Sequence, residues 1–158
     1  MAAVMATRSA WMVAWAIGLG LAGCASGPPK PATVSGAIEA SAQLNPTVNK
    51  RPSPILLRVY ELKTAAAFNS ADFMALYQAD QATLGAEMLA REEFTLRPGE
   101  NRPYTKALSG DTRFIGVVGA YRDLERATWR AIVPVQPGKP HKLTIKVGDL
   151  AVSATMAP

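Results

Sequence analysis

The sequence predicts a mainly β fold, an antiparallel β-sandwich with a short helical insertion. Three observations lead to this expectation. Segments in which apolar and polar residues alternate recur along the chain, proline and glycine separate them at regular intervals, and one stretch changes to helical periodicity. Strands do not alternate with helices, which argues against a parallel α/β sheet. We therefore expect seven or eight short strands in one domain.

The first two expected strands cover residues 34–44 and 54–62, and Asn45-Pro46 ends the first. Successive side chains of a strand point to opposite faces. The second strand should therefore place Glu61 on the same face as Val59, with Tyr60 on the other.

A helical insertion follows the second strand. Ser70 can cap a helix over residues 70–77, which carries Phe73, Leu76 and Tyr77 on one face. Asp80 can cap a further turn that ends at Gly85.

The remaining strands are expected where alternation returns, and turn residues such as Pro98-Gly99 separate them. Gly148-Asp149 is typical of a two-residue hairpin between the last two. Most aromatic side chains should pack in the core. The expected strands are residues 88–96, 103–108, 113–121, 128–135, 142–147 and 150–155.

The N-terminus has the layout of a secretory signal peptide over residues 1–23. Arg8 precedes an apolar run at residues 10–21, which is shorter than the roughly 20 residues of a membrane-spanning helix. Leu21-Ala22-Gly23-Cys24 resembles the lipobox that bacterial lipoprotein signal peptidases cut. The alternative is an ordinary cleaved signal with a chance cysteine nearby.

Cleavage at the lipobox makes Cys24 the first residue of the mature chain and implies that it carries acyl chains. Several chains on one residue anchor a protein firmly, whereas a single myristoyl chain holds only marginally. Ala25 follows in place of the aspartate that retains many lipoproteins at the inner membrane, so we expect the periplasmic face of the outer membrane. Residues 24–32 would form a lipidated tether, and residues 33–158 the β-sandwich domain.

Composition narrows the classes of function. Removing residues 1–23 takes away only Arg8, so 16 Lys and Arg remain against 12 Asp and Glu. No aromatic residues are interleaved with the basic ones, and nucleic-acid binding has little support. Because Cys24 is the one cysteine in the sequence, a disulfide within the chain is excluded.

Catalytic motifs are missing from the sequence. The single histidine, His141, is expected to be an exposed structural residue, and Glu92 and Glu93 should point to opposite faces of a strand. The charged run 122–126 is interpreted as a solvated connection. We expect no enzyme activity, no metal and no cofactor besides the covalent lipid on Cys24.

Several segments together resemble the TssJ family, the lipoproteins of the type VI secretion system. The most specific is Arg51-Pro52-Ser53-Pro54 leading into Leu57-Arg58-Val59-Tyr60-Glu61-Leu62. Further matches follow in order along the chain: Phe68, Ala71-Asp72-Phe73, Leu76-Tyr77, Leu84-Gly85, Glu93-Phe94-Thr95-Leu96, Pro98-Gly99, Gly116-Val117, Tyr121-Arg122-Asp123 and Trp129-Arg130.

The resemblance implies a transthyretin-like sandwich that captures the periplasmic domain of TssM and, with TssL, forms the membrane complex of the secretion system. It also implies that the loop between the first two strands makes this contact. An exposed loop of about nine residues on a rigid scaffold fits recognition, although an ordinary solvated connection is the alternative. The loop residues are Asn45, Pro46, Thr47, Val48, Asn49, Lys50, Arg51, Pro52 and Ser53.

A second class of function competes with this one. The same sandwich can serve as a periplasmic lipoprotein that binds a small ligand or protects the envelope. A lipid-anchored hydrolase is a third class, for which the sequence offers no catalytic residues.

Overall fold

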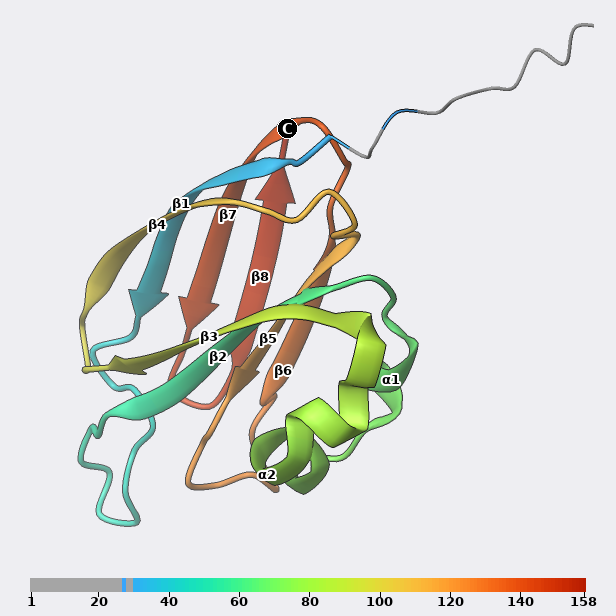
Figure 1. Ribbon diagram of the computed structural model, residues 1–158. Helices are drawn as coiled ribbons and strands as arrows, with labels where there is room; N and C mark the ends of the chain where they lie inside the picture. Colours follow the sequence, from blue (N-terminus) through green and yellow to red (C-terminus); the bar gives the residue numbers. More distant parts are fainter. Residues whose placement is uncertain (1–26, 28–29) are drawn as a thin grey trace, which may run out of the picture.

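The computed structural model describes residues 27 and 30–158, so the expected signal peptide and Cys24 lie outside the described residues. Two four-stranded sheets face each other, and the helices cover the outer face of one of them (Figure 1). The elements are β1 Thr33–Ala40, β2 Ile55–Leu62, α1 Ala66–Ser70, α2 Phe73–Leu84, the 3₁₀ turn η1 Gly85–Glu87, β3 Met88–Leu96, β4 Asn101–Ala107, β5 Phe114–Gly119, β6 Arg130–Pro134, β7 Pro140–Val147 and β8 Val152–Ala157.

The predicted β-sandwich is confirmed, with one pairing that differs from the expectation. The strand orders are β4-β1-β7-β8 and β3-β2-β5-β6, and every pair is antiparallel except β1 with β7, which is parallel. Gly36 lies opposite Leu143 in this parallel pair. A Cβ at Gly36 would lie 1.8 Å from the carbonyl oxygen of Leu143, so the close approach of β1 and β7 requires glycine.

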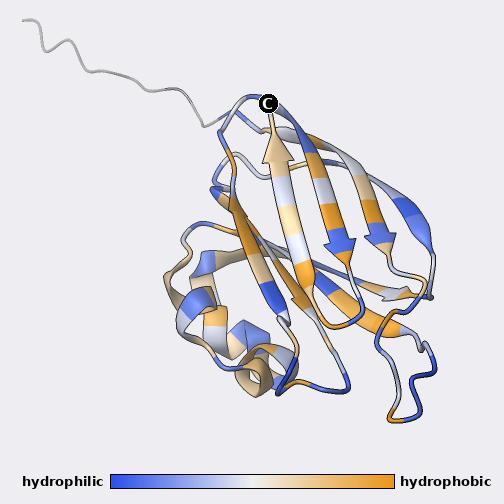
Figure 2. Ribbon diagram, turned by 180° about the vertical axis from the view of Figure 1, so that it is seen from behind, coloured by the Kyte–Doolittle hydropathy of each residue, from blue (hydrophilic) through white to orange (hydrophobic). Residues whose placement is uncertain are grey.

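The main core lies between the two sheets and consists of apolar residues from both. Figure 2 shows hydrophobic residues along the strands of the two sheets. Strand β2 is buried on both faces, because α1 and α2 cover the face that points away from the other sheet. Tyr60, Leu62, Phe68 and Leu76 form a second cluster there. As expected, Glu61 shares the inward face with Val59.

The first strand and the helix begin and end elsewhere than expected. Strand β1 ends at Ala40 because the chain turns at Ser41, whose Oγ accepts a hydrogen bond from Gln43 N at 3.0 Å. Leu44 is nevertheless buried in the core. The cap of α2 is Asp72, not Ser70: Asp72 Oδ1 accepts from Ala75 N at 2.7 Å. The helix ends at Gly85, as the sequence predicts.

Three smaller expectations are corrected. His141 is buried, since β7 points it inward and its Nε2 lies 2.9 Å from the carbonyl oxygen of Gln136. The β7–β8 turn has four residues, because Gly148 N bonds Ala151 O at 2.7 Å. Ala32, at the end of the expected tether, is buried in the core.

Candidate functional site

The loop at residues 45–53 is a closed, hydrogen-bonded structure that projects from one end of the sandwich (Figure 1). Thr47 N donates to Arg51 O, and Lys50 N donates to Thr47 O, each at 2.8 Å. Lys50 has a φ of 58°, which lets the chain reverse inside this small turn. The tip of the loop therefore has a defined backbone conformation.

The two ends of the loop are buried. Asn45 is 3% exposed and Ser53 is 7% exposed. Asn45 Nδ2 donates to Pro54 O at 2.8 Å, and Ser53 Oγ donates to Asn45 O at 2.5 Å. These two predicted contact residues therefore form the base of the loop, and their side chains are not available to a partner.

The tip is what the loop presents to solvent. Val48 is 98% exposed, although it is apolar. Two cationic side chains, Lys50 and Arg51, stand next to it, and both are exposed. Of the nine predicted contact residues, the exposed ones are Val48, Asn49, Lys50, Arg51 and Pro52.

The segment between β5 and β6 supports the base of the loop. Arg122 N donates to Asn45 Oδ1 at 2.9 Å, and Arg122 Nε donates to Ser53 Oγ at 3.0 Å. The interpretation of residues 122–126 as a solvated connection therefore does not hold for Arg122. The only sequence signal for this role is that Tyr121-Arg122-Asp123 belongs to the family resemblance.

A cleft of about 1070 Å³ separates the loop from this segment. Its wall is mixed, with Leu124 and Leu150 among charged groups. Arg126 and Asp123 pair with each other through Arg126 Nε and Asp123 Oδ2 at 2.6 Å. The lining residues are Pro46, Thr47, Val48, Lys50, Arg122, Asp123, Leu124, Glu125, Arg126 and Leu150.

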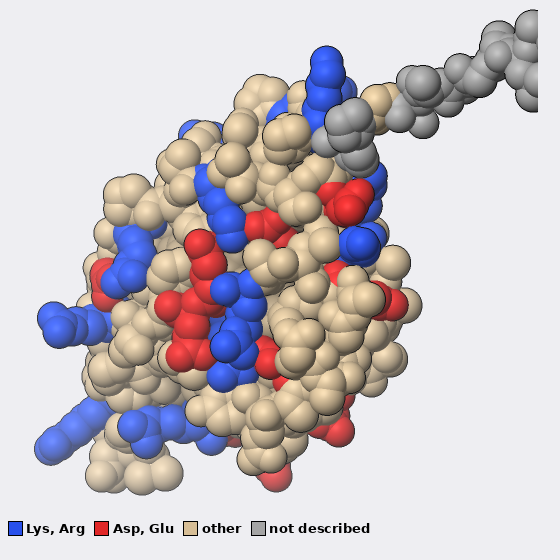
Figure 3. Space-filling view, viewed as in Figure 1, with Lys and Arg blue, Asp and Glu red and all other residues tan. Residues whose placement is uncertain are grey.

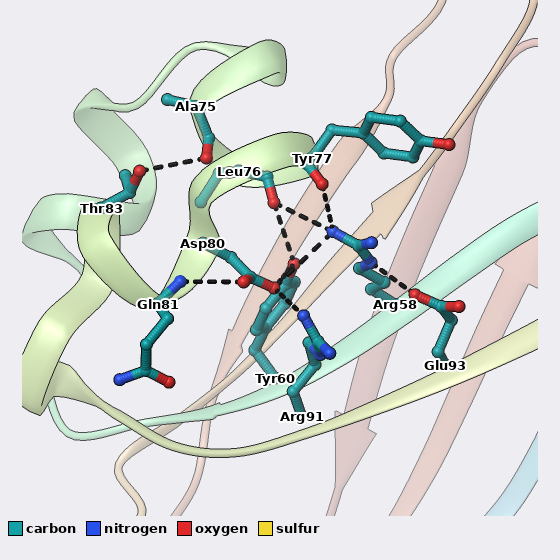
Figure 4. Close-up of polar contacts among 10 residues, drawn as sticks. All are labelled: Arg58, Tyr60, Ala75, Leu76, Tyr77, Asp80, Gln81, Thr83, Arg91 and Glu93. Atoms are coloured by element: carbon teal, nitrogen blue, oxygen red, sulfur yellow. Dashed lines mark hydrogen bonds and ion pairs between the residues drawn. The ribbon is translucent and has the colours of Figure 1, made fainter.

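A second polar cluster fixes α2 to the sheet (Figure 4). Arg58 Nη1 donates to the carbonyl oxygens of Leu76 and Tyr77, at 3.1 and 2.7 Å. Asp80 is buried and accepts from Arg91 Nη1 at 2.6 Å. Burial raises the pKa of Asp80, but the hydrogen bond and charge of Arg91, together with hydrogen bonds from Gln81 and Tyr60, outweigh this effect and hold the pKa below the ordinary value.

A third cluster surrounds Glu61, which is buried inside the sandwich. Its carboxylate lies 2.7 Å from Lys106 Nζ and accepts from Thr112 Oγ1 at 2.7 Å. Glu92 accepts from Tyr104 Oη at 2.6 Å on the same side of the sheet, whereas Glu93 pairs with Arg58 on the other. Since their partners are structural side chains, these carboxylates stabilise the fold.

The described part of the chain holds neither a cluster of metal ligands nor a helix that could span a membrane. Over residues 27 and 30–158, no group of three His, Cys, Asp or Glu side chains is placed to hold a metal ion. Over the same residues, none of the helices has the length and apolar character needed to cross a membrane.

The fold and the loop geometry define the class of protein: a β-sandwich domain that presents a braced, exposed loop at one end. The family described as "Type VI secretion lipoprotein, VasD, EvfM, TssJ, VC_A0113" matches residues 32–150. The chain belongs to this family of type VI secretion lipoproteins.

Solved structures agree with this assignment. The lipoprotein TssJ1 from Pseudomonas aeruginosa is 41% identical, with a TM-score of 0.78 over 81% of this chain and 98% of that one. Serratia marcescens Lip, a membrane-bound component of the same kind of system, is 27% identical, with a TM-score of 0.71 over 78% and 96%. No curated protein sequence matches the chain.

A third similarity supports the fold alone. A chain in the structure of the T6SS protein TssM C-terminal domain (869-1107) from EAEC is 24% identical, with a TM-score of 0.61 over 80% of this chain and 98% of that one.

Proposed function

We propose that this lipoprotein is anchored by acyl chains on Cys24 at the periplasmic face of the outer membrane and captures the periplasmic domain of TssM. Through TssM it is linked to TssL in the membrane complex of the secretion system. Its role is to bridge and not to catalyse. The contact is made by the tip of the loop at residues 45–53.

The observation that carries this proposal is the exposure of Val48 on a loop whose base is fixed. Val48 is 98% exposed on a braced loop, and covering this apolar side chain with a partner would remove apolar surface from water, which is favourable. Because hydrogen bonds already hold the backbone of the tip, a partner would have little conformational entropy to remove on binding.

The direction of the loop also supports a bridging role. Residues 30–32 lead into the first residue of β1, and the loop lies beyond its last residue, at the opposite end of the sandwich (Figure 1). Eight residues of strand separate the two ends by about 26 Å. An anchor on the N-terminal side would leave the loop free to meet a partner that comes from the other membrane.

The test is the affinity of the mature chain for the periplasmic domain of its own TssM. Val48→Asp and Lys50→Glu together should weaken binding by tenfold or more, roughly the effect of losing one interface hot spot. The matched control is Lys146→Glu, which changes an exposed residue on the outer face of β7. Native affinity in the tip variant would show that the tip is not the contact. Failure of the unchanged protein to bind would contradict the proposal that TssM is the partner.

The anchor is tested separately. Cys24→Ser should give a folded domain that binds TssM in solution but does not stay with the membrane. Secretion that persists in a strain with only this variant would show that the lipid is dispensable.

The cleft beside the loop is the observation that favours the alternative, a ligand-binding periplasmic lipoprotein. A small molecule in the native mass spectrum of the purified protein, released by substitution of Leu124, would support it. We prefer the bridging role because the most exposed feature of this end is the tip and not the cleft.

A further inference from the structure

Three segments meet at the end of the sandwich at which the chain enters, beside the last residue of β8 (Figure 1). Thr33 N donates to Lys139 O at 3.2 Å, and Leu108 N donates to Ala32 O at 2.8 Å. The β4–β5 and β6–β7 connections therefore lie beside the first described residues. We call residues 30–33, 107–113 and 135–142 the tether end.

Cationic side chains gather at the tether end. Lys30, Lys139 and Lys142 are exposed, and Arg113 is half-buried. Lys30 lies against Gly138, the neighbour of Lys139. Figure 3 shows Lys and Arg side chains close to the point where the chain enters the domain.

These positive charges are not neutralised locally. Among the described residues, none of the four cations forms an ion pair with a carboxylate. Asp111, the acidic residue of the tether end, already lies 3.8 Å from Lys63. Lys139 Nζ donates to the neutral side chain of Gln136 at 3.0 Å, which is not a counter-charge. The tether end is therefore a net positive surface.

The anchor keeps this surface close to a membrane. Seven residues separate Cys24 from Ala32, and even a fully extended chain of that length spans only about 25 Å. The tether thus keeps the lysines within about 25 Å of the headgroups, and its compact conformations bring them within a Debye length, about 8 Å. The lipid anchor thus supplies proximity, and the lysines supply charge opposite to that of an anionic lipid.

We propose that the tether end is a second membrane contact, in which Lys30, Arg113, Lys139 and Lys142 bind the anionic headgroups of glycerophospholipids around the acylated Cys24. This inference rests on the proposed function, because it needs the anchor. The contact orients the domain so that the loop at residues 45–53 points away from the bilayer, and the tether alone would not fix that orientation.

The experiment uses the lipidated protein in two kinds of vesicle, phosphatidylcholine alone and phosphatidylcholine mixed with phosphatidylglycerol. An amine-reactive reagent labels lysines, and mass spectrometry gives the rate at each one. Lys30, Lys139 and Lys142 should react about fivefold more slowly on the anionic vesicles, the size expected when each basic residue gains a contact with an anionic surface. High salt should remove the difference.

The chain supplies its own controls. Lys146 lies on the same face of β7 as Lys142 but four residues further from the tether end, and Lys50 lies on the loop tip. Both should react at the same rate on the two kinds of vesicle. The variant K139E/K142E should lose the protection of Lys30, and K50E/K146E, with the same change in net charge, should keep it.

Equal rates at all five lysines on both kinds of vesicle, for a protein that stays bound to them and still binds TssM, would overturn this inference alone. Equal protection of Lys50 and Lys146 would show that the domain lies flat, which also overturns it. A protein that does not stay with either vesicle has no anchor, and that result contradicts the proposed function.

Discussion

The backbone N–H of Arg122 donates a hydrogen bond to Asn45 Oδ1 at 2.9 Å, although the two residues are 77 positions apart in the chain. The same arginine donates from Nε to Ser53. One residue of the β5–β6 connection thus holds both ends of the loop at residues 45–53. The conformation of that loop is determined by the domain around it.

Asn45→Ala should lower the free energy of unfolding by about 2–3 kcal/mol, because two side-chain hydrogen bonds are lost and Asn45 has a left-handed φ of 46°. Urea denaturation measures the loss. Asn45→Gly should be less destabilising, since glycine tolerates this φ. The exposed Asn49→Ala is the matched control and should change stability by less than about 0.5 kcal/mol.

Arg122→Ala should mobilise the loop without unfolding the domain. We expect a loss of about 1 kcal/mol in stability, faster hydrogen exchange at the amides of Thr47 and Lys50, and weaker binding of TssM. Arg126→Ala, which breaks an exposed pair in the same connection, should leave the exchange of those amides unchanged. Arg122→Ala removes the bond from Nε to Ser53 but keeps the backbone bond to Asn45. Unchanged exchange would therefore mean that the guanidinium is not needed to hold the loop.

Glu61 should make stability depend on pH. Burial raises the pKa of Glu61, but hydrogen bonds from Lys106, Ser109 and Thr112 outweigh this effect, so its pKa in the folded protein lies below the ordinary value of 4.5. A carboxyl group of this kind stabilises the fold fully above its unfolded pKa, and the contribution is lost as the pH falls through the folded pKa.

The free energy of unfolding should therefore fall as the pH is lowered below about 4.5. Glu61→Gln should be less stable at pH 7 by about 1–3 kcal/mol and should lose part of this slope. Denaturant titrations at several pH values measure both effects. The exposed Glu125→Gln should follow the unchanged protein, and a slope retained in Glu61→Gln would assign the pH dependence to other carboxyl groups.

Arg58→Ala should loosen α2, because the guanidinium donates to two carbonyl oxygens of that helix and pairs with Glu93 at 2.8 Å. Hydrogen exchange should accelerate over residues 73–84 more than over β7. Arg58→Lys should recover little of the protection of residues 73–84 against hydrogen exchange. An ammonium group lacks the planar donors that reach both α2 and Glu93. Exchange that accelerates equally in α2 and β7 would indicate global destabilisation.

Gly36→Ala should be severely destabilising, by about 3 kcal/mol or more, because its Cβ would collide with the backbone of β7. Thermal or urea unfolding checks this prediction. Gly27→Ala is the control, since nothing lies within 4 Å of a Cβ there. Near-native stability of Gly36→Ala would mean that β1 and β7 can move apart.

The sequence predicted the fold best where local pattern determines structure. Alternation placed the strands within a few residues, and it put Glu61 on the inward face of β2. It did not predict that β1 and β7 are parallel, because alternation looks the same in either direction and the two strands lie far apart in the chain. It assigned the helix cap to Ser70, since Ser70 and Asp72 both have side chains that cap helices.

The sequence located the loop between the first two strands, but it did not separate the residues of its base from those of its exposed tip. Asn45 and Val48 lie in the same short stretch of sequence. The fold makes Asn45 a support, through its bonds to Pro54 and Arg122, and leaves Val48 at the surface. The contribution of residues 122–126 was missed for the same reason. A charged run in a sequence indicates a solvent-exposed segment. Only the fold places Arg122 against Asn45 and Ser53.

Strand β1 also has a mechanical consequence. It lies between β4 and β7, with the anchored side of the chain before Thr33 and the loop after Ala40. A pull between membrane and partner would act along β1 and load the hydrogen bonds of both ladders in shear, all at once. This arrangement resists force better than one in which bonds open singly, and it suits a domain held at two opposite ends.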